Sequence, residues 1–415
     1  MDANPLSDGA RVVIIGGGPG GTGCALTLQN MAVQTGRRIQ ITILEGKQFS
    51  GERHYNQCAG VLSPPLPELL ETRLNIPFPI HLDHIEIPGY VLHTGKETII
   101  LAGDEHPSTA LRRIQFDEYM LRITQERGIK IKTARAVDLE FHLDRVIIYA
   151  ENATLEADVV VGAFGLDEGT AALFARHTAY RPPDALSSVV TKYHPETDNM
   201  ATFGSYIHAF LPTHPRIEFG AITPKKNHLT INIAGRDVDA TLMQTFLADP
   251  QVRAALPWPE QPQQYKTADF QFFKGRFPCS KALNYYGDRY VMVGDAAGLV
   301  RSFKGKGVTS AILTGIRAAE AILQTGISQQ ALNDSYRTAN QDILRDLPYG
   351  RAMRQLTIIM SRFGLLDPVI RAAQHDPALQ QALFDAVSAH APYNEIAGKA
   401  LQPQVIWGVL RAFAS

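Results

Sequence analysis

The pattern of apolar residues near the start of the chain predicts a strand, a glycine turn and a helix. Four apolar β-formers at residues 12–15 are typical of a short strand buried on both faces. Glycines interrupt the run, and apolar residues then return at helical spacing from Ala25. A second apolar run at residues 39–44 ends in Glu45 and predicts the next parallel strand. The first 46 residues therefore predict a β-α-β unit.

Further along, the pattern predicts an α/β unit that is interrupted by a β-rich one. Helical spacing between Ser108, a candidate N-cap, and Gly128 predicts a helix. A buried strand at residues 289–294 is followed by helical patterns from Thr309 to the end. Apolar or alternating runs predict strands in the remaining segments, at residues 85–102, 129–141, 145–149, 156–163, 201–210, 217–222 and 228–234.

These elements predict an α/β fold, with a Rossmann-like domain, an inserted antiparallel β-rich domain and a helical C-terminal region. A chain of 415 residues accommodates such a division, because one unit takes about 150 residues. We expect the Rossmann-like domain to comprise residues 1–174, with some strands shared with the insert, and residues 281–327. The β-rich substrate domain is expected at residues 175–280 and the helical region at residues 328–415.

Composition and charge narrow the class of protein. The sequence is 45% hydrophobic, enough for a large core, and its net charge of −1 gives no reason to expect a nucleic-acid partner. Cys24, Cys58 and Cys279 have no metal-ligand spacing, so no metal site is predicted, and their odd number favours a reducing compartment. The start of the chain has no signal-peptide pattern and no apolar run could span a membrane, so we expect a cytoplasmic protein.

An apolar stripe in the C-terminal region leaves peripheral membrane contact open. Apolar side chains between Met353 and Phe363 repeat on one helical face beside arginines. Such a stripe suits a membrane surface, although it is more often buried core. The apolar segment at residues 405–410 could add to that contact or to a dimer.

The first turn has the chemistry of a dinucleotide site. A Gly-x-Gly-x-x-Gly motif between a strand and a helix brings backbone N–H groups and the helix dipole to a pyrophosphate. Glu45 follows about 20 residues later, where a carboxylate binds a ribose diol, so FAD or NAD is favoured over NADP. The alternative is a glycine-rich turn beside a surface glutamate. The cofactor-binding residues predicted here are Gly16, Gly18, Pro19, Gly20, Gly21 and Glu45.

A second nucleotide fingerprint lies almost 300 residues later. The strand at residues 290–293 ends in Gly294 and Asp295, and small residues follow. The aspartate can accept a hydrogen bond from a ribityl hydroxyl, and the next helix start would face a flavin edge that becomes anionic on reduction. An ordinary helix cap is the alternative interpretation. The predicted cofactor contacts at that helix start are Gly305, Lys306, Gly307 and Val308.

Together these motifs resemble the FAD contacts of flavoproteins with the p-hydroxybenzoate-hydroxylase fold. Within that group the chain is most similar to the geranylgeranyl reductase family, from about residue 10 to 325. The Gln-Cys-Ala-Gly loop at residues 57–60 and the segment at residues 219–225 carry the resemblance beside the Gly-Asp-Ala-Ala-Gly motif. The resemblance implies that FAD is bound, that Cys58, Ala59 and Gly60 lie over the isoalloxazine, and that Arg113 reaches the pyrophosphate; Arg112 is the alternative.

The chain departs from the family pattern at three places. Residues 301–307, Arg-Ser-Phe-Lys-Gly-Lys-Gly, stand where the family has Asn-Pro-Leu-Thr-Gly-Glu-Gly. Thr223 replaces an aromatic residue, and Phe164 replaces an aspartate. The first two lie where the resemblance places the substrate, so prenyl-lipid specificity stays open.

Hydride chemistry would belong to the flavin, and the protein would supply position and electrostatics. Cys58 is the candidate catalytic residue, since a thiol can give a proton to carbon, and a packed, unreactive thiol is the alternative. His54 and Tyr55 could line the same pocket. Basic residues could stabilise reduced flavin, attract an acidic substrate or form a solvated loop; they are Arg301, Lys304 and Lys306.

The sequence therefore supports a leading hypothesis and two alternatives. The leading one is an FAD-dependent reductase of C=C bonds in a small apolar substrate such as an isoprenoid. The alternatives are a flavin-dependent monooxygenase and a flavin electron carrier that acts through a redox partner protein. No second dinucleotide motif occurs, so NAD(P)H or another reductant is expected to dock transiently.

Overall fold

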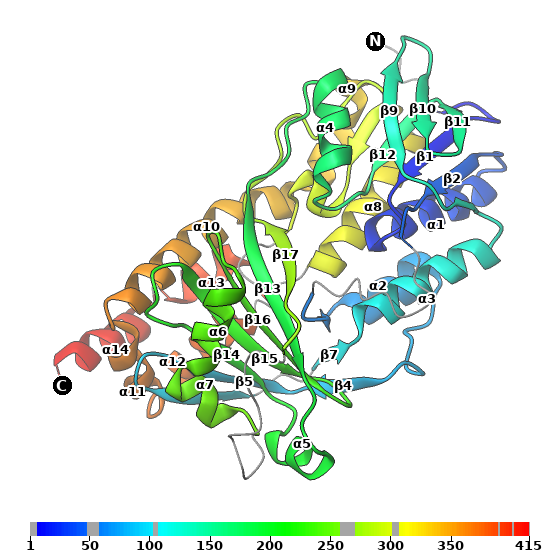
Figure 1. Cartoon of the computed structure of the whole chain (residues 1–415). Coiled ribbons are helices and arrows are strands. Elements are labelled where there is room, and N and C mark those ends of the chain that lie inside the picture. Colours follow the sequence, from blue (N-terminus) through cyan, green and yellow to red (C-terminus); the bar gives the residue numbers. More distant parts are fainter. Residues whose placement is uncertain are drawn as a thin grey trace.

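A computed structural model describes residues 6–47, 58–102, 107–257, 270–300, 307–388, 391–400 and 402–414. Two lobes are visible in Figure 1, one built on a six-stranded sheet and the other on a seven-stranded sheet, with long strands running between them. The C-terminal helices extend along the second lobe, so the chain ends far from its N-terminus. This arrangement agrees with the predicted α/β class and helical C-terminal region.

The six-stranded sheet brings distant parts of the sequence to one edge. Its order is β18 (Tyr286–Gly287), β19 (Tyr290–Met292), β12 (Val159–Gly162), β1 (Arg11–Ile15), β2 (Gln40–Leu44) and β8 (Lys130–Lys132). β1 runs parallel to β2 and β12, and β12 runs parallel to β19. Apolar residues of β1, β12 and β19 are buried, as their unbroken β-branched runs predict. The carboxyl ends of β1 and β19 therefore lie at the same edge, where open α/β sheets bind ligands.

Two helices cover this sheet in direct contact with each other, α1 (Pro19–Gln34) and α8 (Gly307–Gln324). Glycines permit the close approach: a Cβ at Gly315 would lie 2.3 Å from the Gly20 carbonyl oxygen. A Cβ at Gly23 would lie 3.3 Å from the Ile312 Cα. The helix that follows the first glycine motif is thus packed against the helix that follows the second.

The seven-stranded sheet has one strongly apolar face. Its order is β17 (Phe273–Pro278), β13 (Ala185–Tyr193), β16 (Leu229–Gly235), β15 (Ile217–Pro224), β14 (Ile207–Phe210), β5 (Gly89–His93) and β6 (Thr98–Ala102). Val189, Ile231 and Ile233 form a core with Met243 and Phe246 of α6 (Ala240–Ala248), which precedes α7 (Pro250–Ala255). Because alternate residues of a strand face opposite sides, the other face of this sheet carries a different set of side chains.

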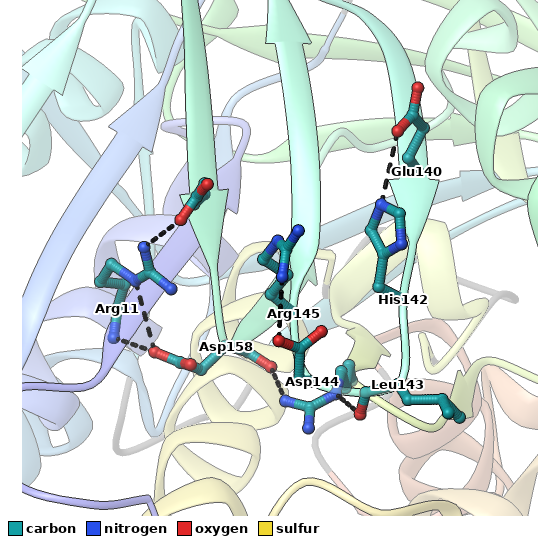
Figure 2. A network of polar contacts seen from close by, with 9 residues as sticks. Arg11, Glu140, His142, Leu143, Asp144, Arg145 and Asp158 are labelled. Carbon is teal, nitrogen blue, oxygen red and sulfur yellow. Dashed lines mark hydrogen bonds and ion pairs between the residues drawn. The ribbon is translucent and has the colours of Figure 1, made fainter.

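A polar network fastens a small sheet to the first lobe (Figure 2). This sheet has the order β11 (Ala153–Ala157), β10 (Val146–Ala150) and β9 (Ala136–Phe141), and α4 (Glu168–His177) packs against β9. Arg11 on β1 bonds Glu156 at 2.6 Å, and its backbone N–H donates to Asp158 at 2.7 Å. Arg289 donates to the carbonyls of Leu143 and Asp158.

The C-terminal region begins on the first lobe, beside β18, and its later helices are anchored to the second lobe. The helical elements of this region are α9 (Gln329–Leu332), the π-helical turn Asn333–Arg337, α10 (Gln341–Arg362), α11 (Leu366–Ala373), α12 (Pro377–Ser388), α13 (Tyr393–Ala400) and α14 (Pro403–Ala414). A buried ion pair joins Arg354 on α10 to Glu218 on β15 at 2.8 Å. Within the described residues, the model contains no helix with the length and hydropathy of a membrane span.

The apolar stripe on α10 is divided between core and surface. Met353 and Met360 pack against buried clusters. Leu356, Ile359 and Phe363 are exposed, the last at 75% of its surface. The core interpretation therefore holds for only part of the stripe, and membrane contact stays a prediction.

The predicted N-cap at Ser108 is wrong. Ser108 begins β7 (Ser108–Leu111), which pairs with β3 (Val61–Leu62) and β4 (His84–Ile87), and its hydroxyl bonds Ser63. The helix, α3 (Arg113–Glu126), begins five residues later, with α2 (Leu66–Leu74) nearby in Figure 1. Pairing with distant strands outweighed the local capping preference of serine.

Another difference concerns residues 201–210, for which we predicted a strand. The first residues belong to a helix, α5 (Thr197–Phe203), and β14 begins only at Ile207. Gly204, with φ of 77°, ends the helix. This positive φ is readily adopted only by glycine, which has no Cβ, so the chain can turn out of the helix here.

The contact between α1 and α8 gives a direct prediction. We expect Gly315→Ala to lower the free energy of unfolding by about 1–3 kcal/mol, because the added methyl group meets backbone atoms that cannot move separately. Gly398→Ala in α13 is the matched control, since a Cβ there meets nothing within 4 Å. Alanine should stabilise that position by roughly 0.5–1 kcal/mol. Urea unfolding of both variants tests this, and equal stabilities would contradict the packing argument.

Candidate functional site

The turn between β1 and α1 is shaped for close approach of a ligand. Gly16 has φ of 109°, and a Cβ there would lie 2.3 Å from the Ala163 carbonyl oxygen. A Cβ at Gly21 would lie 2.0 Å from the Gly16 carbonyl oxygen. Both glycines are therefore required by the fold. Gly18 differs, because nothing lies within 4 Å of a Cβ built on it. Its open side leaves room beside the start of α1.

Glu45 follows β2 and closes the adenosine end of the predicted site. Its Oε2 accepts a hydrogen bond from the Gly17 N–H at 2.7 Å, and its Oε1 accepts one from the Lys47 N–H at 2.7 Å. The residue is 9% exposed, so the carboxylate is held by the backbone rather than by solvent. Each carboxylate oxygen has a further lone pair, which suits ribose hydroxyls.

The second glycine motif lies against the first. A Cβ on Gly20, in the first turn of α1, would lie 3.2 Å from Val293 Cγ2, at the end of β19. Gly294 has φ of 59°, and its N–H donates to the Thr314 hydroxyl of α8 at 2.9 Å. Residues Gly294–Ala297 form a 3-10 turn that carries Asp295 to the start of α8. The two motifs thus converge at one edge of the sheet.

Asp295 lies beside the first residue of α8. A Cβ on Gly307 would be 3.8 Å from Asp295 Oδ1. Burial raises the pKa of Asp295 to about 6, and the nearby Arg113 opposes that shift. Val308 is 4% exposed and packs in the main core, so its side chain faces inward.

Arg113 lies between the second motif and the Cys58 loop. Its guanidinium pairs with Asp117 through two bonds of 2.8 and 3.0 Å. Burial disfavours its charge, but Asp117, Cys58 and Asp295 together raise the pKa of Arg113 above its ordinary value. Two residues predicted from distant motifs, Cys58 and Asp295, therefore both act electrostatically on Arg113.

The loop at Cys58 is held by a lysine. Cys58 is exposed, and its sulfur accepts a hydrogen bond from the Gly60 N–H at 3.4 Å. The buried Lys225 donates from Nζ to the Gly60 carbonyl at 2.7 Å. Burial lowers the pKa of Lys225 to about 7, although Cys58 acts in the opposite direction. Gly60 has φ of 67°, and a Cβ would lie 2.2 Å from the Leu111 carbonyl oxygen, so glycine is required.

Some predicted residues cannot be placed. The residues outside the described ranges are Gly305, Lys306, His54, Tyr55, Arg301 and Lys304.

Cys24 on α1 is fully buried, and burial raises the pKa of its thiol. Phe164, which replaces the family's aspartate, stacks on Phe174 with ring centroids 5.6 Å apart. That departure therefore serves packing.

The sequence pattern did not predict a cavity that lies between α3 and the seven-stranded sheet. The cavity has a volume of about 470 Å³. Its lining includes Arg112, Lys192, Lys225 and His228, which come from three separate segments, the last two residues sharing the connection between β15 and β16. The segment at residues 219–225 had been noted only for its family resemblance. Arg112 precedes Arg113 directly in the sequence, but it lines this cavity. The sequence alone does not show which way its side chain points.

Comparison with known proteins supports the fold at low sequence identity. No family model matches the chain, and neither does any curated protein. A flavoprotein/dehydrogenase from Cytophaga hutchinsonii is 15% identical with a TM-score of 0.69, covering 98% of this chain and 100% of that one. A geranylgeranyl bacteriochlorophyll reductase-like protein from Thermoplasma acidophilum is 17% identical with a TM-score of 0.66, at the same coverages. The chain has the flavoprotein fold.

A third structure is a variant of the halogenase PltM in complex with FAD. It is 14% identical with a TM-score of 0.63, covering 96% of this chain and 87% of that one. The flavoprotein fold is thus shared across almost the whole chain, including the C-terminal helices. The described residues suit FAD, because Gly18 leaves space beside the start of α1 and two acidic residues, Glu45 and Asp295, lie at the ends of β2 and β19.

The environment of Asp295 predicts a pH effect on stability. Its folded-state pKa of about 6 exceeds the unfolded value of 3.8, so the folded protein binds more protons between these values. The free energy of unfolding should therefore fall as the pH rises from 4 to 6, by about 1–3 kcal/mol. Asp295→Asn should remove this slope in flavin-free protein, as measured by urea unfolding at several pH values. An unchanged slope would show that another group is responsible.

Proposed function

We propose that this flavoprotein is an FAD-dependent oxidoreductase that reduces a C=C bond of its substrate by hydride transfer from reduced flavin. The observation that carries the proposal is the convergence of the two glycine motifs at one edge of the sheet. The electrostatic influence of both Cys58 and Asp295 on Arg113 supports placing these residues in the same site. The fold of the geranylgeranyl bacteriochlorophyll reductase-like protein supports the choice of a reductase.

Each residue has a defined part in this proposal. Gly18 and the start of α1 would bind the pyrophosphate, and Glu45 would bind the ribose. Asp295 would accept from the ribityl chain, and the start of α8 at Gly307 would face the reducible ring. Bound FAD would supply the hydride. Cys58 would give a proton to the second carbon, and Lys225 would position the Cys58 loop through the Gly60 carbonyl.

The proposed substrate is a small apolar molecule, an isoprenoid in the leading hypothesis. NAD(P)H or another transient reductant would supply the electrons, either directly or through a redox partner protein. A flavin monooxygenase is the second candidate, because several proteins of the same fold have names that indicate halogenases and one is a peptidyl tryptophan dihydroxylase. The two reactions differ in whether reduced flavin is reoxidised by an alkene or by oxygen with formation of a hydroxylated product.

Gly18 offers a test of FAD binding that separates binding from folding. We expect Gly18→Val to leave the unfolding temperature of the flavin-free protein nearly unchanged, because the added atoms enter open space. FAD affinity should fall at least about tenfold, since the side chain occupies the space proposed for the pyrophosphate. Fluorescence titration with FAD measures this, with Gly398→Val as a control in a distant helix. Equal FAD affinity in all three proteins would argue against this position of the cofactor.

Cys58 gives a test of the reaction. After anaerobic reduction with dithionite, we expect an alkene acceptor to reoxidise the flavin, and Cys58→Ala to slow that step about 100-fold. Reduction of the flavin itself should be unaffected, because the thiol acts only on the acceptor. Cys279→Ala, at the end of β17, is the matched control and should behave as wild type. Reoxidation by oxygen alone, with a hydroxylated product, would favour the monooxygenase.

A further inference from the structure

The cavity between α3 and the seven-stranded sheet has a polar floor. Lys192 on β13 pairs in register with Thr230 on β16, and Val190 pairs with Asn232. Residues opposite one another in a sheet share a face, so Lys192, Thr230 and Asn232 point to the same side. This side is opposite the apolar face that contains Ile231 and packs against α6.

Several buried polar atoms in the lining of this cavity, or on the sheet face next to it, have no hydrogen-bond partner in the described part of the protein. On the sheet side His228 Nε2 belongs to the lining, and Thr230 Oγ1 and Asn232 Oδ1 lie on the same sheet face as Lys192. On the α3 side they are Arg112 Nε and Gln115 Oε1. Thr230 is 1% exposed and His228 is 6% exposed, so bulk solvent does not satisfy them freely. Buried polar groups normally have hydrogen-bond partners, and such a concentration of unsatisfied ones is typical of a binding site.

The charge of the cavity is one-sided. The acid in its lining, Asp83, is paired with Lys226 at 2.7 Å. Among the described residues, Arg112, Lys192 and Lys225 form no ion pair with a carboxylate. Burial and then Arg112 lower the pKa of Lys192, which places the two cations close enough to repel each other. Grouped, partly desolvated cations are stabilised most effectively by an anion between them.

His228, which lines the same cavity, is affected by the same positive charges. Burial lowers the pKa of His228 to about 3, with further lowering by His194, Lys192, Lys225 and Arg112. His228 is therefore neutral near pH 7, and its unpartnered Nε2 remains available for a hydrogen bond. The start of α3, the end of β13 and the connection between β15 and β16 thus direct positive charge or hydrogen-bonding groups into one space.

We infer that this cavity binds an anionic group of the substrate, a carboxylate or a phosphate. The inference rests on the proposed function and adds a charged group to a substrate that sequence analysis expected to be apolar. The cavity adjoins the candidate reaction site, because Lys225 lines it and also bonds the Gly60 carbonyl of the Cys58 loop. Arg112 and Gln115, at the start of α3, would bind the anion close to Arg113.

The inference is tested by anion binding to the holoenzyme. Isothermal titration calorimetry with inorganic phosphate and with benzoate should show saturable binding of one anion per chain for at least one probe. Arg112→Gln and Lys192→Met should each weaken it at least about tenfold, as loss of a charge-assisted hydrogen bond predicts. Arg122→Gln is the matched control, because Arg122 lies on α3 but pairs with Glu126 on the exposed surface.

The two probes distinguish the source of the anionic group. Tighter binding of benzoate indicates a carboxylate substrate, and tighter binding of phosphate indicates a phosphorylated one. Arg112→Lys, which keeps the charge, should retain most of the affinity if charge is what matters. Circular dichroism and flavin content check that each variant is folded, and Lys192→Met serves if Arg112→Gln does not fold.

The result that would overturn the inference is the absence of saturable anion binding, or equal affinity in wild type, Arg112→Gln, Lys192→Met and Arg122→Gln. Failure of the proposed function looks different, because the flavin would then not be reoxidised by any alkene while anion binding to the cavity could persist. Normal flavin chemistry without anion binding would therefore reject only this inference.

Discussion

The close packing of α1 on α8 is the constraint on which the site depends. Backbone atoms of Gly20 and Cys24 lie where a side chain at Gly315 would have to go, so these helices can approach only through glycine. Parallel pairing of β1 and β19 with β12 brings the ends of these two strands to one edge of the sheet. The contact between the helices then holds the starts of α1 and α8 beside that edge, so that Gly18 and Asp295 can belong to one cofactor site.

The second lobe contributes through the division between its two faces. One face of the seven-stranded sheet supplies apolar residues such as Ile231 and Ile233 to a core with α6. The opposite face carries Lys192, which lines the cavity beside α3, and its cross-strand neighbour Thr230. The same strands therefore stabilise the lobe on one side and supply binding groups on the other. Lys225 connects this polar face to the Cys58 loop, and so links the proposed anion site to the proposed chemistry.

Local sequence was sufficient for the elements that carry the nucleotide motifs. The unbroken apolar run at residues 12–15 and the Gly-Asp at the end of β19 predicted strands that the structure contains. Ser108 was misassigned because its role depends on pairing with Ile87, which lies 21 residues earlier. A propensity argument weighs only neighbours along the chain, so this non-local pairing was invisible to it.

The cationic cavity was also hidden, for a related reason. Arg112, Lys192 and His228 are ordinary surface-type residues in sequence, and only strand register and the position of α3 bring them together. The one available signal in the sequence is Lys192, a charged residue within the apolar strand β13. It could not be interpreted, because the sequence does not show which side of that strand faces the core. The reduction chemistry and the substrate class accordingly stand as proposals, whereas the flavoprotein fold is established.

The most direct test of the account is a crystal structure of the protein with FAD. We predict that the adenosine ribose lies at Glu45, the pyrophosphate beside Gly18, and the flavin end at Asp295 and the start of α8. FAD bound at another surface, or a protein that binds no flavin, would contradict the central claim that the two glycine motifs form one cofactor site.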